Sequence, residues 1–359
     1  MTQKVAVAMS GGVDSSVAAA LLKEQGYDVL GITLQLHDRK GTGSTSFDSC
    51  CGSSDMADAR SVAETLGIPH YYFDYVDNFR ESVISYFKES YLAGETPNPC
   101  IACNQYVKFD RLLRQAETLG ADYLATGHYA RIENNGQCFV LKKAIDPDKD
   151  QSYVLYRLHQ PQLSRLLFPI GHYTKPQIRE LAHRLGLQTA DKPDSQEICF
   201  VPNNDYREFL AGEIPEGQRP AGPIRHKDGR LLGRHKGLPF YTIGQREGLG
   251  VAVGHPLYVT GIDRRSNTLV VGRKEDVMAS RLIIREVSWG SGQIPGLPRP
   301  IQLKIRYKHK EAPATLDAGS EGMFLAVFEK PQSAITPGQA AVFYEGETVL
   351  GGGVIDHAI

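Results

Sequence analysis

No stretch of this 359-residue chain is apolar for long enough to cross a bilayer, and its N-terminus lacks the basic region and apolar stretch of a targeting segment. We therefore expect a cytoplasmic protein without a membrane-bound part. The chain also lacks an excess of charge of either sign, with 40 Lys and Arg against 41 Asp and Glu. This balance argues against nucleic-acid binding through overall charge, although local basic patches remain possible.

Cysteine is sparse, with six residues in the chain. In a cytosolic protein of this size, cysteines are more often reactive, metal-binding or buried than joined in a disulfide framework. Nothing around Cys50, Cys51 or Cys138 supplies a base or a set of metal ligands, so we expect these three to be structural.

Two common nucleotide-binding fingerprints, G-x-x-x-x-G-K-[ST] and G-x-G-x-x-G, are absent near the N-terminus. The sequence SGGVDSS, residues 10–16, stands there instead, between an apolar run from Val5 and a helix expected over 15–25. Glycines at this position let backbone N–H groups point outward at the positive end of a helix, where they bind anions. The alternative is a tight turn with an ordinary helix cap. The position after a first strand favours phosphate binding.

Strands and helices alternate up to about residue 205, which predicts a doubly wound parallel sheet. We expect further helices over 54–66, 78–92 and 105–118. The sequence then becomes rich in proline, glycine and charge, and continues with short apolar runs separated by turns. These runs predict antiparallel strands in one or two small β-barrels. We place the domains at 1–205, 206–277 and 278–359.

The stretch TPNPCIACNQYVKF, residues 96–109, carries Cys100 and Cys103 close to an expected helix start. A helix N-terminus lowers the pKa of a thiol, so reactive thiolates are expected here. Zinc, an iron–sulfur cluster, a redox pair or inert buried thiols are the alternatives. A second stretch, KPDSQEICFVPNNDYREF at 192–209, places Cys199 next to Phe200. Taken alone, that cysteine is more typical of a core position than of a catalyst.

Taken together, these motifs resemble the bacterial tRNA-specific 2-thiouridylases, within the PP-loop superfamily of ATP pyrophosphatases. The resemblance extends over essentially the whole chain. Beyond the motifs already quoted, it rests on CCG and DMADARSVA within 50–63, ATGHYARI at 125–132, KDQSYVLY at 149–156, FPIG at 168–171, DSQEICFVP at 194–202 and GLPFYTIGQREGLG at 237–250. It implies an adenine-nucleotide α-hydrolase-like fold followed by two barrel-like domains.

The resemblance implies an enzyme that uses ATP to activate the C2 oxygen of uridine 34 in tRNA and replaces that oxygen with sulfur. Pyrophosphate would leave into the loop, and Asp14 would position Mg²⁺. The ATP-binding residues implied are Ala8, Met9, Ser10, Gly11, Gly12, Val13, Asp14, Ser15, Leu34 and Gly127.

For the sulfur step, the resemblance implies that Cys199 carries a persulfide and that Cys103 is the nucleophile. The sulfur donor would be a cysteine desulfurase or a sulfur-relay protein. Cys100 departs from the family, since most relatives carry aspartate there. Its thiol leaves two further possibilities: an extra resolving cysteine, or a [4Fe-4S] cluster held by Cys100, Cys103 and Cys199.

The resemblance also implies a set of tRNA contacts: His128, Lys149, Asp150, Gln151, Arg306, Tyr307 and Gln339. Such side chains supply stacking, phosphate pairing and hydrogen bonds to unstacked bases. The alternatives are that His128 caps a turn, that Tyr307 belongs to the core and that the segment KIRYKHK is a solvated edge strand. Two rival functions remain, a PP-loop synthetase adenylating a small metabolite and a non-enzymatic RNA-binding or iron–sulfur protein.

Overall fold

The computed structural model describes residues 2–37, 53–194 and 197–359. Cys50 and Cys51, for which the sequence predicts structural roles, lie outside the described residues. In the described part of the chain, no helix combines the length and the apolar character that a membrane span requires.

The N-terminal part is built on five parallel strands in the order β3-β2-β1-β4-β7. Alternate residues of β1 point to opposite faces. Val5 and Val7 pack with helices α1 (Val13–Glu24), α2 (Ser53–Leu66) and α8 (Lys175–Arg184), whereas Ala6 packs with the helical segment over 99–118. Helices therefore cover both faces, and the doubly wound prediction is confirmed. The strands are β1 (Lys4–Ala8), β2 (Asp28–Gln35), β3 (His70–Asp74), β4 (Tyr123–Thr126) and β7 (Leu166–Leu167).

The first two helices follow their predictions closely. Helix α1 (Val13–Glu24) begins two residues earlier than expected, because Gly12 takes the extended N-cap conformation. Helix α2 (Ser53–Leu66) begins one residue earlier. The helix predicted over 78–92 is α3 (Val76–Phe79), a π-helical segment η1 (Arg80–Ile84) and α4 (Ser85–Leu92).

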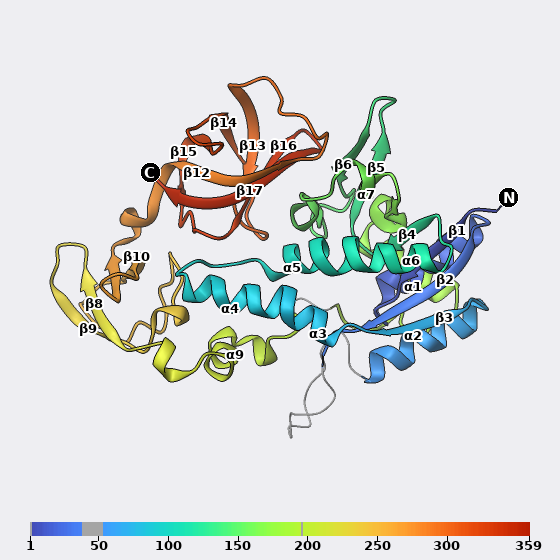
Figure 1. Cartoon of the computed structure of the whole chain (residues 1–359), viewed down its shortest axis with the longest axis horizontal. Coiled ribbons are helices and arrows are strands. Elements are labelled where there is room, and N and C mark those ends of the chain that lie inside the picture. Colours follow the sequence, from blue (N-terminus) through green and yellow to red (C-terminus); the bar gives the residue numbers. More distant parts are fainter. Residues whose placement is uncertain (1, 38–52, 195–196) are drawn as a thin grey trace.

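The helix predicted over 105–118 begins six residues earlier, as α5 (Pro99–Ala102), η2 (Cys103–Leu112) and α6 (Leu113–Thr118). Pro99 fits the first helical position, and the Asn98 side chain accepts the N–H of Cys100 at 3.1 Å. Figure 1 shows this helical segment and the one over 76–92 running from the parallel sheet to below the C-terminal strands.

The middle part holds a four-stranded sheet in the order β10-β11-β8-β9. Its strands are β8 (Gly222–His226), β9 (Leu231–His235), β10 (Tyr258–Asp263) and β11 (Thr268–Gly272). Strands β8 and β11 pair in parallel. Strand β8 lies in the segment rich in proline, glycine and charge, where the sequence predicted no strand. The long connection lies between β9 and β10, and β11 follows β10 as an antiparallel hairpin that brings β11 beside β8.

The C-terminal part is a closed six-stranded barrel, as the sequence predicted. Neighbours run β12-β15-β14-β13-β16-β17, and β17 pairs with β12 to close the ring. Its strands are β12 (Met278–Trp289), β13 (Arg299–Lys304), β14 (Ala312–Ala318), β15 (Phe324–Ser333), β16 (Ala340–Glu345) and β17 (Thr348–Ala358).

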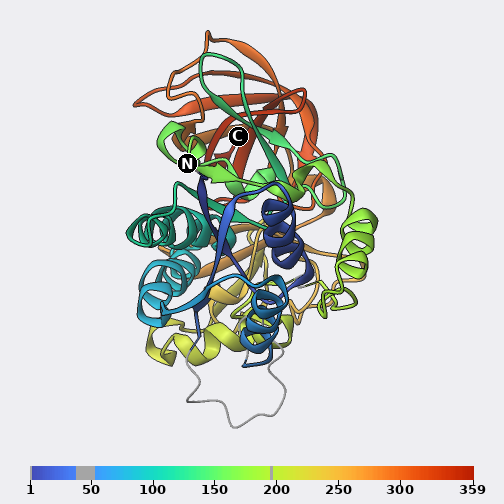
Figure 2. The ribbon, with the colours of Figure 1, turned by 90° about the vertical axis from the view of Figure 1, so that its right-hand side faces the viewer.

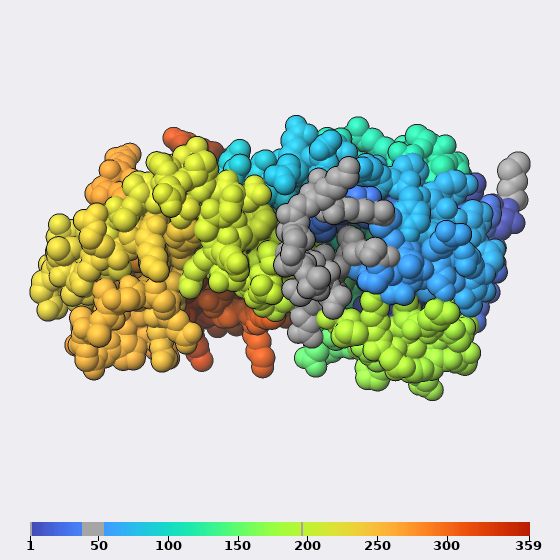
Figure 3. Space-filling model, turned by 90° about the horizontal axis from the view of Figure 1, so that it is seen from below, coloured from blue at the N-terminus to red at the C-terminus, as the bar shows by residue number. Residues whose placement is uncertain are grey.

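A hairpin from the N-terminal part joins this barrel sheet, which the sequence did not predict. It consists of β5 (Ala130–Asn134) and β6 (Phe139–Lys143), and β6 pairs with β17 through Lys142 and Thr348. Figure 2 shows the hairpin rising beside the barrel. Figure 3 shows the middle sheet at one end of the molecule and the first helices and strands at the other.

Short helices connect these elements. They are η3 (Ser152–Leu155), α7 (Gln160–Leu163), η4 (Pro169–His172), α8 (Lys175–Arg184), η5 (Pro202–Asn204), α9 (Tyr206–Glu213), η6 (Glu216–Gln218), η7 (Leu238–Phe240) and η8 (Lys274–Val277). Helix α8 bears on the site below, because it packs against α1.

Candidate active site

The SGGVDSS loop lies at the carboxyl end of β1, between β2 and β4, where open α/β sheets bind their ligands. Gly11 has a φ of 76°, and a Cβ there would lie 2.1 Å from the backbone oxygen of Asp55. The turn thus requires glycine. No side chain caps the start of α1 at Gly12, so its N-terminal N–H groups are not consumed by a side-chain cap. An anion is their natural partner.

Serine hydroxyls fix the shape of this loop. Ser15 Oγ accepts the N–H of Ser10 at 3.2 Å and donates to the oxygen of Gly12 at 3.2 Å. Ser16 Oγ also donates to the Gly12 oxygen, at 2.9 Å. The side chains of Met9 and Val13 are buried in the core. Within the predicted ATP stretch these two residues therefore anchor the loop, and Ser10 to Gly12 form its turn.

Gly127 and Leu34, also predicted near the nucleotide, differ in their surroundings. A Cβ on Gly127 would lie 2.7 Å from the backbone nitrogen of Ser15, so glycine lets the end of β4 approach the start of α1. Leu34 lies on β2 and packs, partly buried, against the core. Gly127 thus borders the loop directly.

The carboxylate of Asp14 is already engaged in the structure. It accepts Lys175 Nζ at 2.8 and 2.9 Å and the Tyr129 hydroxyl at 2.8 Å. Burial and the neighbouring Asp14 raise the pKa of Tyr129, so this hydroxyl remains a donor. Asp14, predicted to position Mg²⁺, is therefore held by an ammonium group here.

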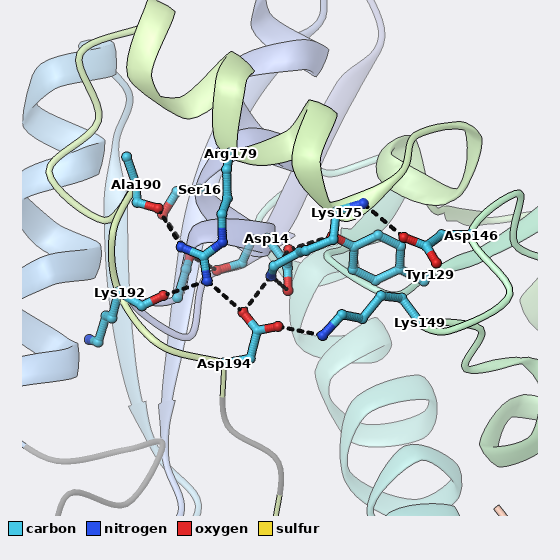
Figure 4. A network of polar contacts seen from close by, with 12 residues as sticks. Asp14, Ser16, Tyr129, Asp146, Lys149, Lys175, Arg179, Ala190, Lys192 and Asp194 are labelled. Atoms are coloured by element: carbon cyan, nitrogen blue, oxygen red, sulfur yellow. Dashed lines mark hydrogen bonds and ion pairs between the residues drawn. The ribbon is translucent and has the colours of Figure 1, made fainter. Parts of the chain in front are cut away.

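Asp194 is the second acidic centre, and three cations converge on it (Figure 4). Lys149 Nζ lies 2.6 Å from its carboxylate, Lys175 Nζ 2.7 Å and Arg179 3.2 Å. Burial alone would raise the pKa of Asp194, but the hydrogen bonds from Lys149 and Lys175 hold it below its ordinary value. The carboxylate is thus ionised at neutral pH.

Lys192 connects this group to the loop. Its Nζ donates to the oxygen of Gly11 at 3.1 Å and forms ion pairs with Asp55 and Asp58 of α2. Its backbone oxygen accepts Arg179 at 3.1 Å. Sequence reasoning missed Tyr129, Lys175, Arg179 and Lys192. The spacing of Lys175 and Arg179, four residues apart at the start of α8, is the signal that would have found two of them.

The thiols lie in a different setting from the one predicted. Cys103 is buried, and it shares an apolar cluster with Phe79, Phe87 and Phe200, against which Cys199 also packs. Burial raises the pKa of Cys103 in spite of the nearby charge of Lys108. The expected lowering by the helix N-terminus was wrong for this thiol, since loss of solvent outweighs the helix field. Cys100 is exposed.

No disulfide joins any two of the four described cysteines, Cys100, Cys103, Cys138 and Cys199. Over residues 2–37, 53–194 and 197–359, no three His, Cys, Asp or Glu side chains are grouped as a metal site requires. Cys100, Cys103 and Cys199 are thus not arranged to hold three irons, and the residues present do not fit a [4Fe-4S] cluster.

The chain is similar to known proteins over nearly its whole length. Its residues 3–203 match the family model described as a tRNA methyl transferase HUP domain, 207–273 the corresponding PRC-barrel domain and 279–355 an aminomethyltransferase β-barrel domain. The tRNA-specific 2-thiouridylase MnmA of Heliobacterium modesticaldum is 51% identical over 99% of this chain and 93% of its own length. The MnmA protein of Clostridium acetobutylicum is 49% identical over 99% and 100%. The chain belongs to the tRNA-specific 2-thiouridylase family.

In this member of the 2-thiouridylase family, several residues predicted to touch tRNA make contacts within the protein. His128 is buried between Phe109 and Phe168, and its Nδ1 hydrogen-bonds Thr126 at 2.6 Å. Burial holds its pKa well below the ordinary value, so the ring is neutral. Asp150 accepts the Ser152 hydroxyl at 2.8 Å, and Gln151 accepts the N–H of Tyr129 at 2.9 Å.

Two of the barrel residues predicted to touch tRNA, Gln339 and Tyr307, lie near the segment that carries Cys100. Gln339 Nε2 donates to the oxygen of Thr96 at 2.7 Å. Arg306 donates to the oxygen of Ser333 at 3.2 Å, and Tyr307 is partly exposed, with its ring 6.1 Å from that of Tyr153. Burial raises the pKa of Tyr307 to about 12, with Asp150 and Cys100 as nearby groups that act in the same direction. In this 2-thiouridylase, the barrel and the thiol-bearing helix thus meet.

Proposed function

We propose that this protein replaces the C2 oxygen of uridine 34 with sulfur in tRNAs of the Lys, Glu and Gln type. The reaction would use ATP and release AMP and pyrophosphate in the cytoplasm. The proposal rests on the presence of two features in one domain. The anion-binding loop after β1 suits activation by ATP, and the two thiols packed on one apolar cluster suit sulfur transfer. The names of the relatives support 2-thiolation of uridine in tRNA.

Activation of the uridine comes first. The C2 oxygen attacks the α-phosphorus of ATP, a new O–P bond forms, and the bond to the bridging oxygen of pyrophosphate breaks. The N–H groups at the start of α1 and the hydroxyls of Ser10 and Ser15 stabilise the departing charge. C2 then carries an adenylate, which is a far better leaving group than the original oxygen.

Mg²⁺ bound with a nucleotide takes one or two carboxylates and keeps several waters, so it does not need an all-protein cage. Asp14 is the carboxylate that would hold it, once Lys175 turns from that carboxylate to a phosphate. The ion would neutralise charge on the polyphosphate.

Sulfur transfer follows at the two thiols. A desulfurase or relay protein delivers sulfur to Cys199 as a persulfide. The Cys103 thiolate attacks the Cys199 Sγ, and the terminal sulfur leaves as hydrosulfide, which adds to C2 and expels AMP. A Cys103–Cys199 disulfide remains and takes two electrons from a thiol reductant before the next turnover. A variant order lets the persulfide attack C2 first and gives the same disulfide.

Binding of tRNA is assigned to the face where the barrel meets the helix at Cys100. Arg306 and Tyr307 supply a cation and a partly exposed ring, the pair that recognises phosphates and unstacked bases. The acidic and amide side chains at 150 and 151 hold the adjoining turn.

The test is mass spectrometry of tRNA nucleosides after incubation with ATP, Mg²⁺ and a persulfide donor, with Cys199→Ser as the matched control. We expect 2-thiouridine and AMP in equal amounts with the unaltered protein, and no 2-thiouridine with the control. A methylated nucleoside formed instead would favour the activity named in two of the family models. AMP formation without tRNA would favour a synthetase of small metabolites.

A further inference from the structure

Three cations share one carboxylate next to the SGGVDSS loop. Lys149, Lys175 and Arg179 all contact Asp194, and Lys175 also contacts Asp14 (Figure 4). The side chain of Lys175 is only 9% exposed. Burial of an ammonium group costs free energy unless the group is paired with a carboxylate. The buried Lys175 therefore depends on the carboxylates of Asp14 and Asp194. The carboxylates in contact with these cations are Asp14 and Asp194, and a third, Asp146, accepts the backbone N–H of Lys175 at 2.9 Å.

The cations are arranged as an anion site. Lys175 and Arg179 stand four residues apart on α8 and therefore project from one face of that helix. Arg179 is further held by the backbone oxygens of Ala190 and Lys192, at 2.7 and 3.1 Å, which fixes its planar guanidinium. A guanidinium binds carboxylates and phosphates with the same geometry, so the oxygens of Asp194 and those of a phosphate are interchangeable partners.

The same group reaches the phosphate loop from two sides. Asp14, the partner of Lys175, lies in the first turn of α1, where the helix end has no side-chain cap. Lys192, whose backbone holds Arg179, donates from its side chain to the Gly11 oxygen. The positive helix end and the three cations thus face one region, and a polyphosphate is long enough to touch both.

We propose that Lys149, Lys175 and Arg179 form the site for the β- and γ-phosphates of ATP, and that Asp194 occupies this site until the polyphosphate displaces it. The inference rests on the proposed use of ATP. It gives Asp194 the role of a built-in competitor. After the α–β bond breaks, pyrophosphate holds the cations without its link to the adenosine, and Asp194 competes with it for the same cations and so promotes its release.

Asp194→Asn tests the proposal directly, because asparagine keeps the shape and loses the charge. Binding of sodium tripolyphosphate, ATP and adenosine is measured by isothermal titration calorimetry without tRNA. We expect the variant to bind tripolyphosphate and ATP about tenfold more tightly, since the site is no longer occupied by its own carboxylate. Adenosine affinity should not change. Asp191→Asn is the matched control, because its side chain is 89% exposed and pairs with His183.

Lys175→Gln should weaken tripolyphosphate binding by about tenfold or more, since it removes a cation from the site. A structure of the unaltered protein with tripolyphosphate covers the case in which Asp194→Asn does not fold. There we expect phosphate oxygens on Lys175 and Arg179 and the Asp194 carboxylate beyond ion-pair distance. Equal or weaker tripolyphosphate binding by folded Asp194→Asn would overturn the proposal, as would a complex in which Asp194 keeps all three cations.

These outcomes are separable from those of the proposed function. Normal tRNA thiolation together with unchanged tripolyphosphate binding in Asp194→Asn would refute only the competitor role. Tighter binding in the variant, with no thiolation by the unaltered protein, would refute the thiolation and leave the polyphosphate site standing.

Discussion

Gln339 of the barrel donates its side-chain N–H to the backbone oxygen of Thr96 across a distance of 2.7 Å. The backbone N–H of Thr96 in turn donates to the oxygen of Pro337 at 2.8 Å. Two hydrogen bonds thus fix the start of the segment that leads through Asn98 to Cys100. The barrel therefore fixes the segment just before the helix that carries Cys100 and Cys103. This role is separate from any contact between the barrel and RNA.

Gln339→Ala should therefore lower tRNA thiolation more than it lowers ATP binding. We expect a loss of about 0.5 to 1.5 kcal/mol in stability for the missing hydrogen bond. The check is the ratio of thiolation rate to ATP affinity, with thermal unfolding as the readout of stability. Gln332→Ala is the matched control, because its amide contacts the oxygen of Lys330 on the same strand. Equal effects of the two changes would argue against this role.

Asp14→Asn should preserve the fold and reduce AMP formation on the order of a hundredfold, because a neutral amide neither holds Lys175 nor binds Mg²⁺ well. The assay is tRNA-dependent conversion of ATP to AMP. Tyr129→Phe is the control, since it removes only one hydrogen bond to the same carboxylate, and its loss should be much smaller. Near-normal AMP formation by Asp14→Asn would remove the loop from the mechanism.

Arg306→Ala should weaken tRNA binding by about 1 to 3 kcal/mol and reduce its salt dependence, because one phosphate or stacking contact is lost. Binding is measured by filter retention over a range of salt concentrations. Lys330→Ala removes one exposed charge from the same barrel and controls for overall charge. If both variants weaken binding alike, the effect belongs to the charge of the barrel and not to Arg306.

Cys103→Ser and Cys199→Ser should each abolish thiolation, whereas Cys100→Ser should retain much of it, because attack and resolution take two sulfurs. AMP formation should survive in all three variants, which separates loss of sulfur chemistry from loss of folding. An inactive Cys100→Ser protein that still forms AMP would count against a two-thiol mechanism. It would give the exposed third thiol a part in resolution.

The raised pKa of Cys103 predicts that the rate of sulfide release from the Cys199 persulfide depends on pH. Burial keeps the thiol protonated, so the reactive thiolate fraction at neutral pH is small and grows with pH until the pKa is passed. Single-turnover release of sulfide from the Cys199 persulfide should therefore rise by about tenfold per pH unit between about pH 7 and 8.5. Lys108→Gln should move the rise to higher pH, since the Lys108 charge lowers this pKa. A rate that does not change with pH would contradict the assignment of Cys103 as nucleophile.

The sequence predicted the elements whose signals are local. Alternating apolar strands and helices gave the parallel sheet, and the glycines of SGGVDSS gave the phosphate loop. The sequence-based prediction was wrong about the pKa of Cys103, because proximity to a helix start is local information and burial by Phe79, Phe87 and Phe200 is not. Strands β8 and β9 were missed because their charged residues and turn glycine hide the strand pattern.

The cation group around Asp194 was missed for a related reason. Lys149, Lys175 and Asp194 are far apart in the chain, and each is an ordinary charged residue in its own segment. Packing of α8 against α1 brings Lys175 beside Asp14, and Lys149 and Asp194 join them from connecting segments outside both helices. The spacing of Lys175 and Arg179 indicated a shared helix face, but no local pattern indicated what that face would meet.

The pairing of β6 with β17 bears on how the protein can be made. During synthesis, residues 130–143 leave the ribosome long before residues 348–358. The hydrogen-bonding edge of β6 therefore remains unpaired until β17 has been synthesised. The backbone N–H of Lys143, which donates to the oxygen of Glu347 at 2.8 Å, is likewise unpaired until Glu347 has been synthesised. A fragment that ends before the barrel would keep this strand edge open to other chains. Expression of the N-terminal part alone should thus yield aggregated protein, and co-expression with the barrel should rescue it.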